Sequence, residues 1–348
     1  MRILLTGGGT LGPVTPLLAL ATELKKENAS IVGFIGTHGG PEKNLVEKSG
    51  IKFFAIASGK LRRYFDLRTI FVPFFVLIGF VQSLILLAKL KPTIVVSASG
   101  YVGVPVLIAA WILKIPSITH QQDVRPSLAN QLARSFVKKI TVTFEASLNI
   151  FGKKAVHTGN PIRTELLSGN ASRARAEFGL EENIHTVLVL GGGTGSVFIN
   201  DLVEKSLSEL TLFCQIIHST GKGKKKPGSM NRYHAFELLT DNLADAFAVA
   251  DLVIARAGMA TISELSVLAK PAIIIPLVGT HQEDNAKLLG DRNAAVVLSQ
   301  NELTVTEFVK KIKELLDDPA WCSRLSLEIK KINPSDALVR MMKVVKEI

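Results

Sequence analysis

Two similar stretches of the chain indicate the fold: ILLTGGGTLGPVTP at residues 3–16 and VLVLGGGTGSVF at residues 187–198. In each of them, a short apolar run leads into a glycine-rich loop. After the first loop, Leu17, Leu20 and Leu24 recur at the spacing of one helix face. An apolar strand, a glycine loop and a helix open a doubly wound α/β domain. The repeat therefore predicts two domains of this kind.

Strand and helix signals alternate through the rest of the chain. Because helices separate successive strands, crossover connections and parallel sheets are expected. We predict one domain over residues 1–160, a second over 161–333, and a C-terminal helix at 334–348 that could pack back on the first domain. A central ligand cleft is expected between the domains, at the carboxyl ends of both sheets. The strands are predicted at residues 2–6, 30–36, 93–99, 115–120 and 138–144, and then at 186–193, 214–220, 252–258, 271–277 and 294–299.

Composition narrows the class of protein. The chain has 348 residues, of which 47% are hydrophobic and 20% charged, so a folded globular protein is expected. Its two cysteines, Cys214 and Cys322, lack metal-ligand spacing and favour a reduced protein. The first residues show no signal-peptide pattern. The net charge of +11 favours anionic partners. Nucleic acid is disfavoured among them, because no stripe of basic and aromatic residues occurs.

One apolar segment, IFVPFFVLIGFVQSLILLA, runs from Ile70 to Ala88 between basic flanks. Its length approaches the roughly 20 residues of a membrane span, but Pro73 and Gly79 interrupt it. Three interpretations stay open: a core helix of the first domain, an interfacial helix whose outer face dips into a bilayer, and a true span. For an interfacial helix, each basic flanking residue near anionic lipid contributes about 1 kcal/mol.

The first glycine loop formally matches a dinucleotide fingerprint, with Gly7, Gly9 and Gly12 after a strand. NAD is disfavoured, because the second strand ends without the carboxylate that would hold the ribose. No glycine-lysine pair is followed by serine or threonine, so the sequence has no P-loop either. The first glycine loop therefore indicates only a general kind of binding site. Its glycines let backbone N–H groups approach a phosphate or a sugar at the start of a helix.

The stretch ARAGMATISELSVLAKP, at residues 255–271, is a sharper signal in the second domain. A strand ends there, and a helix is expected to begin near Thr261 with N–H groups suited to a diphosphate. Glu264 follows three residues later and has two interpretations. It could close the helix start as a capping-box partner, or it could accept hydrogen bonds from a ribose. The spacing alone favours the cap.

Taken together, these motifs resemble the MurG family of peptidoglycan glycosyltransferases. The similarity runs nearly end to end and adds SGKLRRYFD (58–66), SASGYVGVPV (97–106), GNPIRTELL (159–167), IIHSTGKG (216–223) and HQEDNA (281–286). Family membership implies the GT-B fold, with two Rossmann-like domains and the sugar nucleotide bound mainly by the second. It implies an inverting transfer of N-acetylglucosamine from UDP-GlcNAc to lipid I, which gives lipid II. The resemblance also implies a peripheral enzyme on the cytoplasmic face of the bacterial membrane, without a cofactor.

The resemblance also implies where substrates bind. The first glycine loop would reach the sugar and phosphate, and the second loop the diphosphate. Arg163 would contact the nucleotide, Thr240 the uracil and Gln282 the sugar, while Glu264 becomes a ribose ligand rather than a cap. The implied substrate contacts are Thr10, Leu11, Gly12, Asp123, Arg163, Gly193, Thr194, Thr240, Met259, Ala260, Thr261, Ser263, Glu264 and Gln282, and the acceptor positions are Arg62, Arg63 and Tyr101, with His120 and Asp123 near them.

Three positions depart from the family pattern. Pro13 stands where the family usually has a histidine that is favoured as the general base, and proline cannot accept a proton. Gly193 replaces a usual serine, which removes a hydroxyl from the phosphate loop. Gln121 stands where glutamate is usual. The donor contacts are therefore retained, whereas the catalytic base has to be found elsewhere.

We hypothesise that Asp123, in the HQQD stretch, takes over as general base, with His120 as the second candidate. Alternatively, Asp123 caps a helix that begins near Pro126. No Asp-x-Asp motif occurs, so no metal ion is expected. Backbone N–H groups would then stabilise the charge of the leaving diphosphate.

Three other functions share this fold and stay open. One is a GT-B transferase that acts on another lipid, such as diacylglycerol. Another is a UDP-GlcNAc 2-epimerase, although that enzyme needs no membrane face and the apolar segment argues against it. The third is a non-catalytic module that binds the UDP-sugar and in which Pro13 marks a decayed active site.

Overall fold

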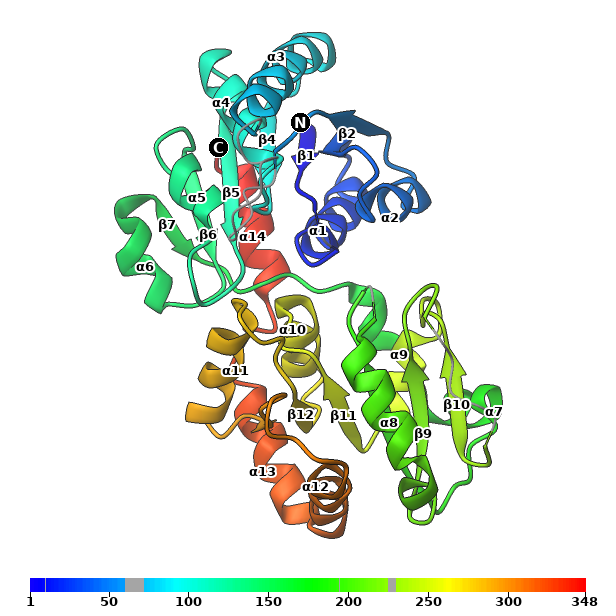
Figure 1. Cartoon of the computed structure of the whole chain (residues 1–348). Coiled ribbons are helices and arrows are strands. Elements are labelled where there is room, and N and C mark those ends of the chain that lie inside the picture. Colours follow the sequence, from blue (N-terminus) through cyan, green and yellow to red (C-terminus); the bar gives the residue numbers. More distant parts are fainter. Residues whose placement is uncertain (10, 60–71, 194, 225–229) are drawn as a thin grey trace. The chain divides into compact units, whose positions relative to one another are not determined.

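The computed structural model describes residues 1–348 except 10, 60–71, 194 and 225–229 (Figure 1). The chain forms two compact units. The first comprises Met1–Arg163 together with Ser335–Ile348, and the second comprises Thr164–Pro334. Each unit is a parallel sheet with helices packed on it, as predicted. The predicted cleft between the domains stays a prediction.

The first unit holds a seven-stranded sheet in the order β3-β2-β1-β4-β5-β6-β7, and all of its neighbouring strands are parallel. The sequence did not indicate β3 or β7, which have only four and three residues. The elements are β1 (Arg2–Thr6), α1 (Val14–Lys26), β2 (Ser30–Thr37), α2 (Glu42–Lys48), β3 (Phe53–Ile56), α3 (Val72–Leu90), β4 (Ile94–Ser97), α4 (Gly103–Ile112), β5 (Ser117–Gln121), α5 (Leu128–Ala133), β6 (Lys139–Val142), α6 (Ala146–Phe151), η2 (Gly152–Lys154), β7 (Ala155–His157) and, from the chain end, α14 (Ala337–Lys346).

The second unit holds a six-stranded parallel sheet in the order β10-β9-β8-β11-β12-β13. Its strand β10 was not indicated by the sequence. The elements are η3 (Thr164–Ser168), α7 (Ala171–Phe178), β8 (His185–Leu190), α8 (Val197–Leu210), β9 (Cys214–Ser219), β10 (Tyr233–Phe236), α9 (Leu243–Val249), β11 (Leu252–Ala255), α10 (Met259–Val267), β12 (Ala272–Ile274), α11 (Gln282–Asp291), β13 (Val296–Val297), α12 (Val305–Asp317) and α13 (Pro319–Ile329).

The strand order reverses beside the first strand of each sheet. In the first unit the reversal lies between β1 and β4, and in the second between β8 and β11. In open α/β sheets, the crevice at the carboxyl ends of two such strands is where ligands bind. The two glycine loops follow β1 and β8 directly, so each loop lies at the switch point of its own sheet.

Alternating side chains of β1 build two cores in the first unit. Ile3 and Leu5 belong to the cluster that α1 and α14 cover. Leu4 points to the opposite face and belongs to the cluster that α3 and α4 cover. The C-terminal helix thus packs on α1 in the first unit, with Met341 fully buried.

Helix α3 packs on α4 and β3 through one face and leaves the other exposed. Its inner face is fixed at Ala57, whose N–H donates to Gln82 Oε1 (2.7 Å) and whose carbonyl lies where a Cβ at Gly79 would be. Only 17% of the apolar window Pro73–Leu90 is buried, although its length and composition would suit a membrane span. The helix is therefore not buried on all sides as a core helix would be: Leu87 on one face belongs to the core, and the opposite face is exposed. Ile70 and Phe71 of the predicted segment lie outside the described residues.

Candidate active site

The first glycine loop packs tightly against the loop that follows β4. Gly9 has φ +86°, and a Cβ there would lie 2.6 Å from Cε1 of Tyr101. A Cβ at Gly100 would lie 2.8 Å from the carbonyl oxygen of Gly8. Only glycine fits such close contacts. The predicted acceptor position Tyr101 is thus brought against the first loop, whereas Thr10, Arg62 and Arg63 lie outside the described residues.

A buried carboxylate that was not predicted from the sequence supports this loop. Glu42 is fully buried, and its Oε1 accepts hydrogen bonds from Thr37 N (2.8 Å) and Thr37 Oγ1 (2.5 Å). A Cβ at Gly8 would collide with this carboxylate. Burial, and then the charge of Glu42, raise the pKa of Tyr101, so the Tyr101 hydroxyl keeps its proton.

Pro13 directly precedes α1. Its φ of −65° and ψ of −20° suit a helix start, and no side chain caps this end. Leu11 and Gly12 are partly exposed in the preceding turn, in which Leu11 O accepts from Val14 N at 3.1 Å. Proline supplies neither a backbone N–H nor a basic atom at this position.

Gln121, at the end of β5, organises the loop that carries Asp123. Its Nε2 donates to the carbonyl oxygens of Asp123 (2.8 Å) and Arg125 (3.0 Å). Its Oε1 accepts from Ser127 N (3.1 Å) and Asn130 Nδ2 (2.9 Å). A glutamate could not donate to the two carbonyls, so glutamine is the residue that fits this loop.

Ser127 is the N-cap residue of α5 and accepts a hydrogen bond from Asn130 N. The alternative that Asp123 caps this helix is therefore wrong. Asp123 is partly exposed, and it stays a predicted base.

His120 does not have the surroundings of a general base for a bound substrate. Its ring is fully buried, with Nδ1 2.9 Å from Thr141 Oγ1 and Nε2 3.0 Å from Asn160 Oδ1. Burial lowers the pKa of His120 to about 4. Both nitrogens are already engaged, so we correct the prediction: His120 links β5 and β6 to the GNPIR segment.

In the second unit, the loop after β8 combines tight and open positions. A Cβ at Gly195 would collide with the carbonyl oxygen of Thr220. Gly192, with φ +85°, has open space in front of it, and Gly193 is exposed. Ser196 caps α8 by accepting from Ile199 N at 3.3 Å. The exposed part of the loop is thus Gly192 and Gly193. The predicted contact Thr194 lies outside the described residues.

Helix α10 begins at Met259, two residues before the predicted start, with Gly258 at its N-cap position. No side chain caps this end, and a Cβ at Gly258 would meet open space. The capping-box interpretation of Glu264 is therefore wrong, because Glu264 lies in the second turn and is buried. The hydroxyl of Ser263, which the resemblance implied as a contact, donates instead to Met259 O at 2.7 Å.

The remaining predicted donor positions occupy several elements. Gln282 opens α11, and its Oε1 accepts from Leu277 N at 3.1 Å. Thr240 is exposed before α9, and its carbonyl accepts from Leu243 N at 3.4 Å. Arg163 is partly exposed at the end of the first unit.

Arg256, which lies between β11 and α10 and is only 8% exposed, was not predicted from the sequence. The signal available was an arginine directly after a fully apolar strand, a position at the ligand edge of a parallel sheet.

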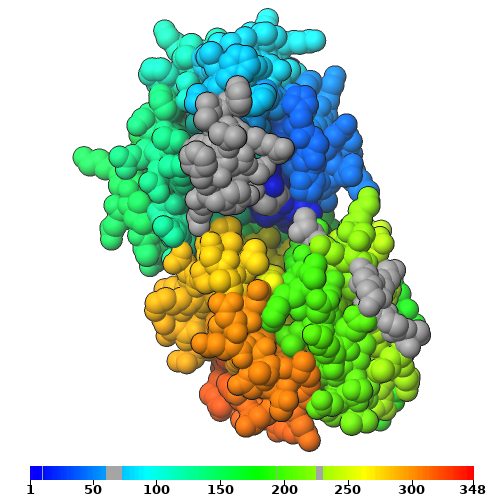
Figure 2. Space-filling model, in the orientation of Figure 1, coloured from blue at the N-terminus to red at the C-terminus, as the bar shows by residue number. Residues whose placement is uncertain are grey.

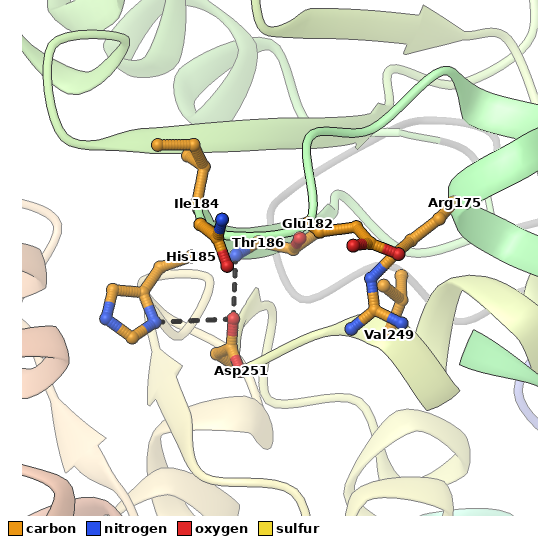
Figure 3. Close-up of a pocket in the computed structure, with 8 residues that line it drawn as sticks. Arg175, Glu182, Ile184, His185, Thr186, Val249 and Asp251 are labelled. Atoms are coloured by element: carbon orange, nitrogen blue, oxygen red, sulfur yellow. Dashed lines mark hydrogen bonds and ion pairs between the residues drawn. The ribbon is translucent and has the colours of Figure 1, made fainter. Parts of the chain in front are cut away.

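A pocket of about 270 Å³ lies in the second unit where β8 begins, at the end of this strand that is remote from the glycine loop (Figure 3). There the Asp251 carboxylate accepts from Thr186 N (2.8 Å) and lies 3.5 Å from His185 Nδ1 (Figure 3). This pocket contains none of the predicted site residues. No group of three or more His, Cys, Asp or Glu side chains suited to a metal ion occurs within the described residues, and the expected lack of a metal stays a prediction.

Comparison with known proteins identifies the family. Residues 3–142 match the glycosyltransferase family 28 N-terminal domain, and residues 186–331 match the family 28 C-terminal domain. The chain belongs to glycosyltransferase family 28. It is 42% identical, over 91% of each chain, to the UDP-N-acetylglucosamine–N-acetylmuramyl-(pentapeptide) pyrophosphoryl-undecaprenol N-acetylglucosamine transferase of Clostridium botulinum (strain Langeland). It is 37% identical, over 99% of each chain, to transferase 2 of the same name from Bacillus cereus (strain ATCC 10987). The resemblance to the MurG family is thus confirmed.

Solved structures show the same fold in this family 28 chain. MurG of Acinetobacter baumannii has a TM-score of 0.75 at 22% identity, covering 100% of this chain and 99% of that one. The calicheamicin glycosyltransferase CalG4 has a TM-score of 0.74 at 14% identity, covering 99% and 97%. UDP-GlcNAc 2-epimerase from Neisseria meningitidis has a TM-score of 0.71 at 13% identity over both whole chains. The GT-B architecture is therefore confirmed, and it is shared by transferases and epimerases alike.

Proposed function

We propose that this family 28 chain moves N-acetylglucosamine from UDP-GlcNAc to lipid I and so makes lipid II for peptidoglycan. One observation carries the proposal: relatives of this name are 37–42% identical over at least nine-tenths of both chains. The epimerase alternative has only the shared fold, at 13% identity. The family 28 match favours transfer to an acceptor over rearrangement of the sugar.

We place the donor on the second unit. No side chain caps the start of α10, and a Cβ at Gly258 or at Gly192 in the loop after β8 would meet open space. A diphosphate is the ligand that such a helix start favours, because N–H groups and the helix dipole both attract negative charge. Glu264 and Thr240 would then hold the ribose and the uracil, and Gln282 the sugar.

Two requirements define the chemistry of the inverting displacement. Negative charge grows on the leaving UDP, and preorganised amides at the switch point of the second sheet would stabilise it. The acceptor hydroxyl loses its proton, and Asp123 is the partly exposed carboxylate that we assign as its acceptor. General-base help is typically worth about 10²- to 10⁴-fold in rate.

We further propose that the chain binds the cytoplasmic face of the membrane as a peripheral protein. The exposed face of α3, which we call the apolar face, consists of Phe74, Leu77, Val81 and Ile85, each 47–62% exposed. In Figure 2, the cyan segment that contains α3 forms part of the outer surface of the first unit. Trp111 on the neighbouring α4 is 54% exposed. The contacts of α3 with Ala57 favour an interfacial helix over a span, because a span would break them.

The decisive experiment offers radiolabelled UDP-GlcNAc to the pure chain with lipid I, with diacylglycerol, or with no acceptor. Label is expected in lipid II only. Label in a glycolipid made from diacylglycerol, or a new free UDP-sugar without acceptor, would establish one of the alternatives instead.

The assigned base is tested separately. Asp123→Asn is expected to lower kcat for transfer by about 10²-fold or more with little change in UDP binding. Glu145→Gln, an exposed carboxylate of the same unit, serves as the control and should transfer normally. Near-normal turnover of Asp123→Asn would remove Asp123 from the mechanism.

A further inference from the structure

Arg256 lies at the switch point of the second sheet, where the donor loops meet. It follows β11 and is 8% exposed. Its Nε and Nη2 donate to Ser196 Oγ at 3.1 and 2.8 Å. Its Nη1 donates to the carbonyl oxygens of Ile275 and Pro276, both at 3.0 Å. One side chain thus connects the segments that follow three adjacent strands, β8, β11 and β12.

These contacts lie in the segments that we assign to the donor. Ser196 ends the second glycine loop and caps α8. Arg256 itself stands two residues before Gly258, the N-cap of α10. Pro276 leads into the loop before α11, which Asn285 fixes to the site by donating from Nδ2 to Ala257 O at 3.0 Å. The guanidinium therefore sets the spacing between the glycine loop and the uncapped helix start.

The charge of Arg256 is balanced by no carboxylate within the described residues. Its hydrogen-bond acceptors are one hydroxyl and two carbonyl oxygens, and the centre of the Phe198 ring lies 5.7 Å from Cζ. Burial lowers the pKa of Arg256. By contrast, Arg173 pairs directly with the buried carboxylate of Asp245. A buried cation with only neutral partners is unfavourable until an anion approaches.

We propose that Arg256 is the positioning residue for the donor diphosphate: through Ser196 it holds the second glycine loop at the right distance from α10, and its charge is compensated when the diphosphate binds between them. This inference rests on the proposed placement of the donor in the second unit. The ligand class is a nucleoside diphosphate, and the charge of its two phosphates is what the site is built to recognise.

The proposed role of Arg256 affects binding of the phosphates and not binding of the nucleoside. Loss of Arg256 should weaken binding of UDP but leave binding of uridine nearly unchanged. A purely structural role would weaken both ligands together. The ratio of the two dissociation constants is therefore the quantity to measure, by titration calorimetry on the full-length protein.

Three variants divide the role into its parts. Arg256→Gln removes the charge, and we expect the Kd for UDP to rise about 100-fold. Arg256→Lys keeps the charge but cannot reach Ser196 and both carbonyls at once, and Ser196→Ala removes the contact to the glycine loop. For each of these two we expect a rise of about 10-fold. Arg292→Gln, an exposed arginine at the end of α11, is the matched control and should bind UDP normally.

The outcomes are distinct. The proposal is supported if UDP affinity falls in the order given and uridine affinity stays within about twofold, with the Michaelis constant for UDP-GlcNAc rising in parallel. It is overturned if Arg256→Gln binds UDP normally, or if uridine binding falls as much as UDP binding. Should Arg256→Gln fail to fold, Ser196→Ala and Arg256→Lys decide by the same ratio. Transfer by the wild-type protein to lipid I tests the proposed function independently of these ratios.

Discussion

At the scale of single residues, Gln121 shows how one amide can set the geometry of a loop. Replacing it by glutamate, the usual residue of the family, keeps the size but turns two donated hydrogen bonds into contacts between a carboxylate and the carbonyls of Asp123 and Arg125. A fully buried carbonyl that loses its donor costs about 1–3 kcal/mol, and these two carbonyls, whose hydrogen bonds are partly buried, should cost less. We therefore expect Gln121→Glu to lower the melting temperature of the first unit.

The same substitution should slow catalysis if Asp123 is the base. A shift of about 1 Å in a catalytic group can cost about 100-fold in rate, so kcat for transfer to lipid I should fall while the Kd for UDP is unchanged. Gln131→Glu is the matched control, because the exposed Gln131 amide only donates to Pro126 O at 3.2 Å. Equal kcat values for the two variants would show that the Gln121 amide does not position Asp123.

Residue identity alone could not show burial or partners. The sequence correctly marked Pro13 as a position without a basic side chain, but it offered His120 as a substitute. Only the packing reveals that both ring nitrogens of His120 face buried polar groups. Arg256 was overlooked for a related reason. Its proposed role depends on hydrogen bonds to segments that are 60 and about 20 residues away along the chain.

At the scale of elements, the apolar face of α3 is the feature most open to test. Its four side chains recur every three or four residues and lie on the side away from Ala57. Leu77→Glu combined with Ile85→Glu should reduce binding to vesicles that contain anionic lipid, because each loses about 1.5–3 kcal/mol of apolar burial in the bilayer interface. Cosedimentation of the full-length protein with such vesicles measures the loss.

The control for this experiment uses exposed apolar residues of the second unit. Leu212 and Leu327 are 78% and 64% exposed, and their replacement by glutamate should leave vesicle binding unchanged. If the α3 variant still binds like the wild type while its thermal unfolding is normal, the apolar face is not the membrane contact.

Element boundaries were predicted less well than element types. The strand before the first glycine loop was predicted with its observed bounds, Arg2–Thr6. The strand before the second loop was predicted three residues too long, through Gly193, whereas β8 ends at Leu190. The start of α10 was placed two residues late, since Thr261 and Glu264 imitate a capping box. The structure instead begins the helix at Met259 after Gly258. A glycine start without a capping side chain has no sequence signature, yet it is what leaves N–H groups available to a phosphate.

At the scale of the whole molecule, the chain end completes the first unit. Helix α14 packs on α1, and Met341 is fully buried in their shared core. Met341→Ala should lower the free energy of unfolding of the first unit by about 2–5 kcal/mol, measured by denaturant titration. Val339→Ala, on the exposed side of the same helix at 67% exposure, should change it by less than about 0.5 kcal/mol. Equal effects of the two variants would contradict this packing.

The two-domain plan followed from the sequence because each sheet repeats one pattern of strand, glycine loop and helix. What the pattern could not supply is how the polar groups inside each unit are satisfied. In both units, a buried histidine ring lies within hydrogen-bonding distance of two other buried polar side chains. In the first, His120 joins Thr141 and Asn160. In the second, His218 Nδ1 lies 2.9 Å from Tyr233 Oη and its Nε2 lies 3.1 Å from Asn200 Oδ1.

These two histidines predict how stability depends on pH. Burial lowers the pKa of His120 and of His218 from 6.5 to about 4. Between those values the unfolded chain takes up a proton that the folded chain refuses, so stability is complete above pH 6.5 and falls as the pH drops towards 4. Each histidine should account for a loss of about 3 kcal/mol over this window. Denaturant titrations at pH 7, 6 and 5 should therefore show that the free energy of unfolding of both units decreases.

His120→Gln should reduce the pH dependence of the free energy of unfolding of the first unit alone, and His218→Gln should reduce that of the second. His38→Gln, at an exposed position, should reduce neither. If the wild type is equally stable at pH 7 and pH 5, the buried rings do not resist protonation as their surroundings require.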